Sequence, residues 1–251
     1  STTSRLNIGL LGAMPEEIGS DLSHLHDLVQ TDHGDLTLHR GQWSEQVQLT
    51  LAWSGWGKVS AARAATRLLA SAPDLDLLLF SGVAGSADPL LRQWDVVLAD
   101  AVVQHDMNAS PLFPRFTLPP LNRDRLHPDA GWLTWAGNGL GEAHASGELD
   151  GFGRLHQGLV ATGDQFIGDD QVLSDLTTSL PGLMAVEMEG AAVAQVAEQE
   201  GVPWLVMRVI SDGADAAAAS SFSTFIKVYE QSAWALVEAL LKRLDSAPAT
   251  P

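Results

Sequence analysis

One stretch of the chain, residues 184–215, constrains the fold most, because it reads as strand, helix, strand and loop. Acidic residues, Glu187 and Glu189, lie where the first strand enters the helix. Ser211 and Asp212 lie where the second strand ends. In an α/β protein the carboxyl ends of the strands form the binding crevice. The stretch therefore predicts a carboxylate-rich site at one rim of a sheet.

Strands and helices alternate along the rest of the chain. Apolar runs bounded by Gly, Pro or Ser predict further strands at 6–12, 36–43, 47–53, 77–80, 94–103 and 155–162. Helical patterns cover 59–72, 131–145, 169–179 and 221–244. The Gly-rich segment 81–86 is typical of a turn after a buried strand. No repeat or linker divides the chain, so we expect a single three-layer α/β domain, with a mixed, largely parallel sheet flanked by helices. The domain would span 1–251, with flexible tails at 1–5 and 246–251.

Composition narrows the classes of function. The chain has 251 residues, 45% of them hydrophobic, and a mean hydropathy of +0.06, which predicts a globular protein. We expect no membrane span and no signal peptide. Cysteine is absent, which excludes thiolate catalysis and disulfides and fits a cytoplasmic protein. A net charge of −17 without a basic cluster argues against nucleic-acid binding.

Carboxylates remain as the candidate chemical groups. The eight histidines lack metal-ligand spacing, so no metal site is predicted. His105-Asp106 could be a ligand pair, but a hydrogen-bonded structural pair is favoured. No G-x-S-x-G nucleophile motif is present. Four acids follow predicted strands: Glu17, Glu187, Glu189 and Asp212. Such a group suits general acid and base work on a glycosidic or similar bond, although each acid alone could be a helix cap.

Five motifs together carry a resemblance to a known family. They are GAMPEE at 12–17, SGWGK at 54–58, GDQFI at 163–167, VEMEG at 186–190 and RVISD at 208–212. In this order, over about residues 6–240, they resemble the 5′-methylthioadenosine/S-adenosylhomocysteine nucleosidases of the purine nucleoside phosphorylase superfamily. The resemblance implies a nucleoside phosphorylase-like fold and hydrolysis of the ribosyl–adenine bond. It also implies a small-molecule substrate, no cofactor, and a homodimer in which loop 105–114, through Leu112 or Phe113, reaches the partner's site.

The resemblance assigns the catalytic roles. Glu17 resembles the base that positions the attacking water, with Arg208 nearby. Asp212 resembles the acid that protonates adenine N7, oriented by Ser211. Since an Asp has an unperturbed pKa of about 3.9, the site must raise that pKa or pass the proton through the substrate.

The remaining assigned residues would bind substrate. Glu189 resembles the acceptor of the ribose hydroxyls, and Met188 packs on the ribose. Phe166 resembles the ring that stacks on adenine, and the Ile167 backbone reads the edge of the base. The pocket for the 5′-alkylthio group would be lined by Met14, Trp56 and Phe222. Glu187 is open between ribose contact and structural support.

Departures from the family pattern also bear on function. Val83 replaces a hydroxyl residue near the water and ribose, and Trp56 is bulkier than the usual aliphatic residue. Phosphorylases of the superfamily carry an arginine in the loop after the first strand, where this chain has Glu16 and Glu17. We therefore expect hydrolysis. The alternatives are a futalosine-type purine nucleosidase, a nucleoside phosphorylase, and a non-catalytic nucleoside sensor.

Overall fold

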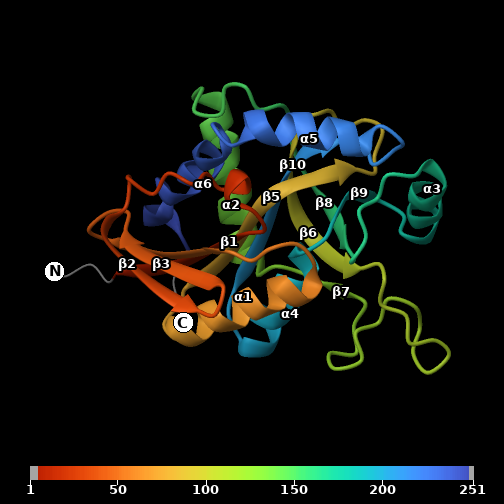
Figure 1. Ribbon diagram of the computed structural model, residues 1–251, viewed down its shortest axis with the longest axis horizontal. Helices are drawn as coiled ribbons and strands as arrows, with labels where there is room; N and C mark the ends of the chain where they lie inside the picture. Colours follow the sequence, from red (N-terminus) through yellow and green to blue (C-terminus); the bar gives the residue numbers. More distant parts are fainter. Residues whose placement is uncertain (1–4, 249–251) are drawn as a thin grey trace.

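The computed structural model describes residues 5–248 as a mixed sheet enclosed by helices (Figure 1). Its strands are β1 Leu6–Gly12, β2 His26–His33, β3 Leu36–Gln42, β4 Val47–Trp53, β5 Leu77–Ser86, β6 Val96–Gln104, β7 Arg125–Leu126, β8 Leu155–Thr162, β9 Leu183–Glu187 and β10 Trp204–Asp212. Its α-helices are α1 Lys58–Ser71, α2 Ala130–Ala145, α3 Asp170–Ser179, α4 Gly190–Glu200, α5 Ala218–Tyr229 and α6 Ala233–Leu241. Two 3-10 helices are η1 Pro15–Glu17 and η2 Leu244–Ser246. Between residues 5 and 248, no helix has the length and apolar character to cross a membrane.

Seven of the ten strands form two parallel sets that run in opposite directions, while β3, β2 and β7 extend the sheet by antiparallel pairing. One set is β4, β1, β5 and β10, and the other is β6, β8 and β9. Antiparallel pairs β10–β6 and β5–β9 join the sets, so part of the sheet closes on itself. The β5–β9 pair joins Gly85 to Val186 and Ser86 to Ala185, near the carboxyl end of each strand. Both sets therefore direct carboxyl ends toward one place.

Helices cover the sheet on both sides. Helices α1 and α4 pack together, and their alanine and leucine side chains join one buried cluster. Helices α2, α5 and α6 contribute to a second cluster on the other side, and α3 caps a third beside β8 and β9. This arrangement confirms the predicted three-layer α/β fold with a mixed sheet (Figure 1).

Several elements differ from the sequence-based expectation, among them the two-residue strand β7, which was not predicted. The Gly-rich segment 81–86 is not a turn: β5 runs through it to Ser86. The helix expected at 221–244 is two helices, because the chain turns at Ser232, whose amide bonds the Tyr229 carbonyl oxygen (2.8 Å). Strand β2 was not predicted, because its side chains are almost all exposed and follow no apolar alternation. Of the expected tails, 1–4 and 249–251 lie outside the described residues, and Ser246 closes η2.

Candidate active site

A pocket of about 510 Å³ opens where the two sets of strands meet. All the predicted site residues line it except Arg208, which lies behind its wall. Those lining residues are Met14, Glu17, Trp56, Val83, Phe166, Ile167, Glu187, Met188, Glu189, Ser211, Asp212 and Phe222.

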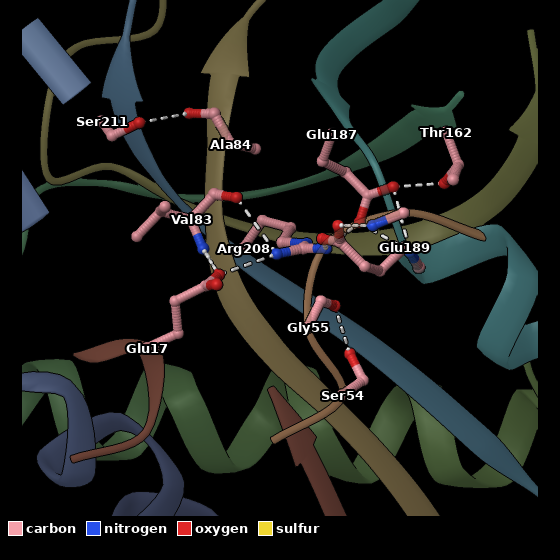
Figure 2. A network of polar contacts seen from close by, with 12 residues as sticks. Glu17, Ser54, Gly55, Val83, Ala84, Thr162, Glu187, Glu189, Arg208 and Ser211 are labelled. Carbon is pink, nitrogen blue, oxygen red and sulfur yellow. Dashed lines mark hydrogen bonds and ion pairs between the residues drawn. The ribbon is translucent and has the colours of Figure 1, made fainter. Parts of the chain in front are cut away.

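Arg208 is the centre of the polar end of the pocket. It lies within β10, is fully buried, and pairs with three carboxylates: Glu17 at 3.2 Å, Glu189 at 3.3 Å, and Glu187 in close contact. Figure 2 shows Glu17 reaching the guanidinium from one side and Glu187 and Glu189 from the other. We call these four residues the pocket floor. One positive charge faces three carboxylates, so the floor favours a bound proton or a cationic ligand.

Backbone groups of β5 hold Glu17 in place. The Val83 amide donates to Glu17 Oε2 (2.8 Å), and the Val83 carbonyl accepts from Arg208 (3.1 Å). The Val83 side chain is therefore not needed for these contacts. At Gly82, a Cβ atom would overlap both the Glu17 carboxylate and the Arg208 guanidinium. Glycine in this strand thus permits a close approach rather than a turn.

Glu187 and Glu189 are held at the start of α4. Glu187 accepts from the Thr162 hydroxyl and from the Gly190 amide (2.8 Å) besides its contact with Arg208. These bonds favour structural support over ribose contact as the role of Glu187, because its carboxylate oxygens already have partners within the protein. Glu189 accepts from the Gly57 amide at 2.9 Å. That bond joins the loop after β4 to the pocket floor.

Asp212 lies on another wall of the pocket. Its Oδ2 accepts from the Ser211 hydroxyl (2.7 Å), and its Oδ1 accepts from the Ala214 amide (2.8 Å). A Cβ at Gly85 would come within 2.9 Å of Oδ1, so β5 makes room for this acid as well. The carboxyl group is fixed in orientation while 7% of the residue remains exposed.

Burial dominates the titration of the acids. It raises the pKa of Glu17 to about 8, although the Arg208 guanidinium opposes the shift. Burial likewise raises the pKa of Glu189 to about 7 against the same guanidinium. Burial also raises the pKa of Asp212, and the bonds from Ser211 and Ala214 offset this only partly. The site can therefore hold carboxyl protons near neutral pH, where an ordinary carboxyl group holds almost none.

Aromatic side chains surround the opening of the pocket. Trp56 and Phe166 each lie edge-on to Phe222, with ring centroids 5.9 Å apart in both pairs. We call these three residues the aromatic rim. Trp56 is 48% exposed and Phe166 39%, whereas every residue of the floor is buried. The rim thus offers apolar faces, and the floor offers charges.

Sequence reasoning missed several contributors. Ala13, Ala84, Gly85, Gln165 and Val186 also line the pocket. Gln165 lies within the GDQFI motif and Val186 begins VEMEG, so each could have been inferred from the motifs. Thr162 and Gly82 support floor residues without lining the pocket, and only the folded arrangement identifies them.

Loop 105–114 lies outside the pocket. Leu112 is 85% exposed and Phe113 is half-buried. His105 is buried, while Asp106 pairs with Lys58 (2.8 Å). Asp106 thus has a structural partner, but this partner is Lys58 rather than His105.

Comparisons with known proteins define the family. The model of the phosphorylase superfamily matches residues 7–242. A 5′-methylthioadenosine/S-adenosylhomocysteine nucleosidase of Chromohalobacter salexigens is 33% identical, over 96% of this chain and 98% of its own length. The chain belongs to this nucleosidase family.

Solved structures of the nucleosidase family have the same fold. The Colwellia psychrerythraea nucleosidase in complex with adenine matches with a TM-score of 0.88 and 28% identity, over 98% of this chain and 99% of its own. A futalosine hydrolase of Helicobacter pylori matches with a TM-score of 0.84 and 31% identity, over 94% and 97%. The predicted family, nucleoside phosphorylase-like fold and enzyme class, an N-glycosyl hydrolase, are therefore confirmed.

Proposed function

We propose that this chain hydrolyses the N-glycosidic bond of 5′-methylthioadenosine, S-adenosylhomocysteine or both, releasing adenine and a thioribose. The proposal rests on family membership and on the buried Glu17 at the pocket floor. In it, Glu17 activates water and Asp212 protonates adenine N7.

The charge of the pocket is the observation that favours water over phosphate. Among the described residues that line the pocket, the charged ones are all acids. The cation behind the wall, Arg208, is already engaged by three carboxylates. A phosphate would enter a negative site with no free positive partner, which costs free energy. Water has no such cost.

The floor suits an oxocarbenium-like transition state. As the glycosidic bond breaks, the ribose gains positive charge, and the nearby carboxylates stabilise it more than they stabilise the neutral substrate. Glu189 would accept from the ribose hydroxyls, and Glu17 in its ionised form would take a proton from the attacking water. Fixed hydrogen bonds keep both carboxyl groups in place before substrate arrives.

Asp212 would act on the leaving base. Adenine leaves poorly as an anion, so a proton at N7 lowers the barrier. Burial raises the pKa of Asp212, which increases the protonated fraction. The Ser211 hydroxyl orients the carboxyl group, and Phe166 at the rim would stack on the base.

An adenine-release assay tests the proposal. Purified protein should release adenine from 5′-methylthioadenosine at a rate that added phosphate leaves unchanged. Strict dependence on phosphate would indicate a phosphorylase. Tight binding of the nucleoside without turnover would indicate a sensor.

A second candidate substrate is futalosine. It is favoured by the likeness to the Helicobacter pylori futalosine hydrolase, whose TM-score of 0.84 is close to those of the nucleosidases. If the protein releases hypoxanthine from futalosine faster than it releases adenine from 5′-methylthioadenosine, futalosine is the preferred substrate.

We also propose a homodimer. Loop 105–114 follows β6 and runs away from the sheet (Figure 1), and its Leu112 is 85% exposed. The proposal rests on the resemblance to the nucleosidase family, in which this loop reaches the partner subunit's site, and Leu112 is the exposed apolar side chain that the loop offers for such a contact. Sedimentation should give twice the monomer mass of 26.7 kDa, and Leu112→Asp should weaken the association. A monomer in the wild type would refute this.

A further inference from the structure

Three loops beside the pocket are tied together by a closed set of contacts, which we call the loop clasp (Lys58, Asp106, Asp164). Lys58 Nζ pairs with Asp106 Oδ1 at 2.8 Å. The Lys58 amide donates to Asp164 Oδ1 at 2.7 Å, and the Asp164 amide donates to Asp106 Oδ2 at 2.9 Å. Each member of the clasp therefore contacts the other two.

Two of the three loops deliver pocket residues next to the clasp. Gly57, which precedes Lys58, donates its amide to Glu189 Oε2 at 2.9 Å, and Trp56 lines the pocket. Asp164 is followed directly by the lining residues Gln165 and Phe166. The clasp thus joins the loop whose Gly57 amide holds Glu189 to the loop that carries the Phe166 ring.

Local packing leaves the clasp little freedom. Gly57 has a φ of 98°, and a Cβ there would lie 3.2 Å from Asp164 Oδ1. At Gly163, a Cβ would overlap the ring of the buried His105. Burial raises the pKa of Asp106, but the bonds from Lys58 and the Asp164 amide outweigh it, so the net pKa is lowered and the ion pair persists at neutral pH.

We propose that Asp106 is a positioning residue that sets the sugar-binding and base-binding halves of the pocket together. Through Lys58 it fixes the loop whose Gly57 amide orients Glu189. Through the Asp164 amide it fixes the loop that carries Phe166. Asp106 touches no reacting atom in this assignment, and the inference rests on the proposed role of Glu189 at the ribose hydroxyls.

The test compares substrates with and without those hydroxyls. In the wild type, kcat/KM is measured for 5′-methylthioadenosine and for its 2′-deoxy and 3′-deoxy analogues. In Asp106→Asn, we expect kcat/KM for the ribose substrate to fall about tenfold, with kcat lowered as well as KM raised, because a misplaced Glu189 loses a charged hydrogen bond that strengthens in the transition state. The deoxy substrate that lacks the Glu189 contact should lose about threefold or less. The preference for the ribose substrate therefore shrinks.

A matched control separates positioning from general destabilisation. Glu148 pairs with Arg243 at 2.7 Å, with side chains 31% and 16% exposed, against 31% and 19% for Asp106 and Lys58. Glu148 does not line the pocket, so Glu148→Gln should leave every substrate ratio unchanged.

A variant of the other partner in the ion pair provides a further test. Lys58→Met should reproduce the loss of preference for the ribose substrate, and the double variant with Asp106→Asn should lose little more of that preference than either single variant. Equal losses on ribose and deoxy substrates in Asp106→Asn would overturn the proposal.

A second measurement needs no substrate. Amide hydrogen exchange at Gly57 and Lys58, followed in the free protein, should accelerate at least tenfold in Asp106→Asn and stay unchanged in Glu148→Gln. Unchanged exchange at these amides would overturn the clasp even in an active enzyme. If the wild type released no base from any adenosine thioether, the proposed function would fail, and the exchange rates would still decide whether Asp106 holds the loop.

Discussion

The pocket floor and the aromatic rim are built in opposite ways. The floor consists of charged groups that are buried and joined through Arg208. The rim consists of three aromatic rings from three separate segments, two of them more than a third exposed. Buried charges must keep their partners, because an unpaired one costs several kcal/mol. Exposed rings can be exchanged at much lower cost. The floor is therefore suited to setting the reaction, and Trp56 and Phe222 of the rim to selecting the substituent on the substrate.

The largest expected effects come from neutralising the proposed base and the proposed acid one at a time. Glu17→Gln and Asp212→Asn should each lower kcat by about 10²–10⁴-fold, because a positioned acid or base contributes that much. Adenine release under saturating 5′-methylthioadenosine measures the loss.

Glu16→Gln is the control for Glu17. It removes the neighbouring carboxylate, which does not line the pocket, and should change kcat little. Near-normal turnover in Glu17→Gln would remove Glu17 from the mechanism.

A single added methyl group should displace the charged groups of the floor without removing any of them, and its effect should be smaller. In Gly82→Ala the new methyl group would overlap the Glu17 carboxylate and the Arg208 guanidinium. We expect kcat/KM to fall about 10²-fold, because small displacements of reacting groups carry such costs.

Gly141→Ala serves as the matched change for Gly82→Ala. Nothing lies within 4 Å of its added Cβ, and alanine favours the helix. It should retain full activity and equal or higher thermal stability. Wild-type kinetics in Gly82→Ala would show that the floor tolerates displacement.

The pH dependence of kcat/KM, which titrates the floor carboxylates, should show the next largest effect. In the proposed mechanism Glu17 must be ionised to activate water. Because its pKa is raised to about 8, kcat/KM should rise about tenfold per pH unit from pH 6 to 7. The apparent pKa belongs to the coupled carboxylates together.

Glu189→Gln should move the rising limb to lower pH, because the Glu189 charge raises the pKa of Glu17. The pH dependence of kcat/KM for variant and wild type measures the shift. A limb that stayed in place would show that another group controls it.

The two regions also differ in how far sequence could predict them. Most rim and floor residues lie in motifs at or near strand ends, so motif positions were enough to list them, whereas Phe222 lies in α5 and was assigned only through the family resemblance. Their mutual contacts were not predictable, because Arg208 meets Glu17 across 191 positions of sequence. Glycines at 82 and 85 were interpreted as a turn, since glycine marks turns and close approaches equally. Strand β2 has no apolar alternation because it lies at an exposed edge of the sheet.

The smallest expected effect concerns the rim and leaves the floor intact. Trp56 lies edge-on to Phe222 and is 48% exposed, so it can contact a large 5′ substituent. The described lining residues include no Lys or Arg to pair with a homocysteine carboxylate. The wild type should therefore prefer 5′-arylthio and 5′-alkylthio adenosines over S-adenosylhomocysteine.

In Trp56→Ile the advantage of the arylthio substrate over 5′-methylthioadenosine should fall about three- to tenfold, the worth of an aromatic pair. Trp43→Leu is the control, since Trp43 precedes the amino end of β4, whereas Trp56 follows its carboxyl end. It should leave the ratio of kcat/KM values unchanged. If Trp56→Ile altered both substrates equally, the rim would contribute to the general shape of the pocket and not to selection of the 5′ group. The division between a floor that reacts and a rim that selects would then fail at the rim, while the predictions for Glu17 and Gly82 would stand.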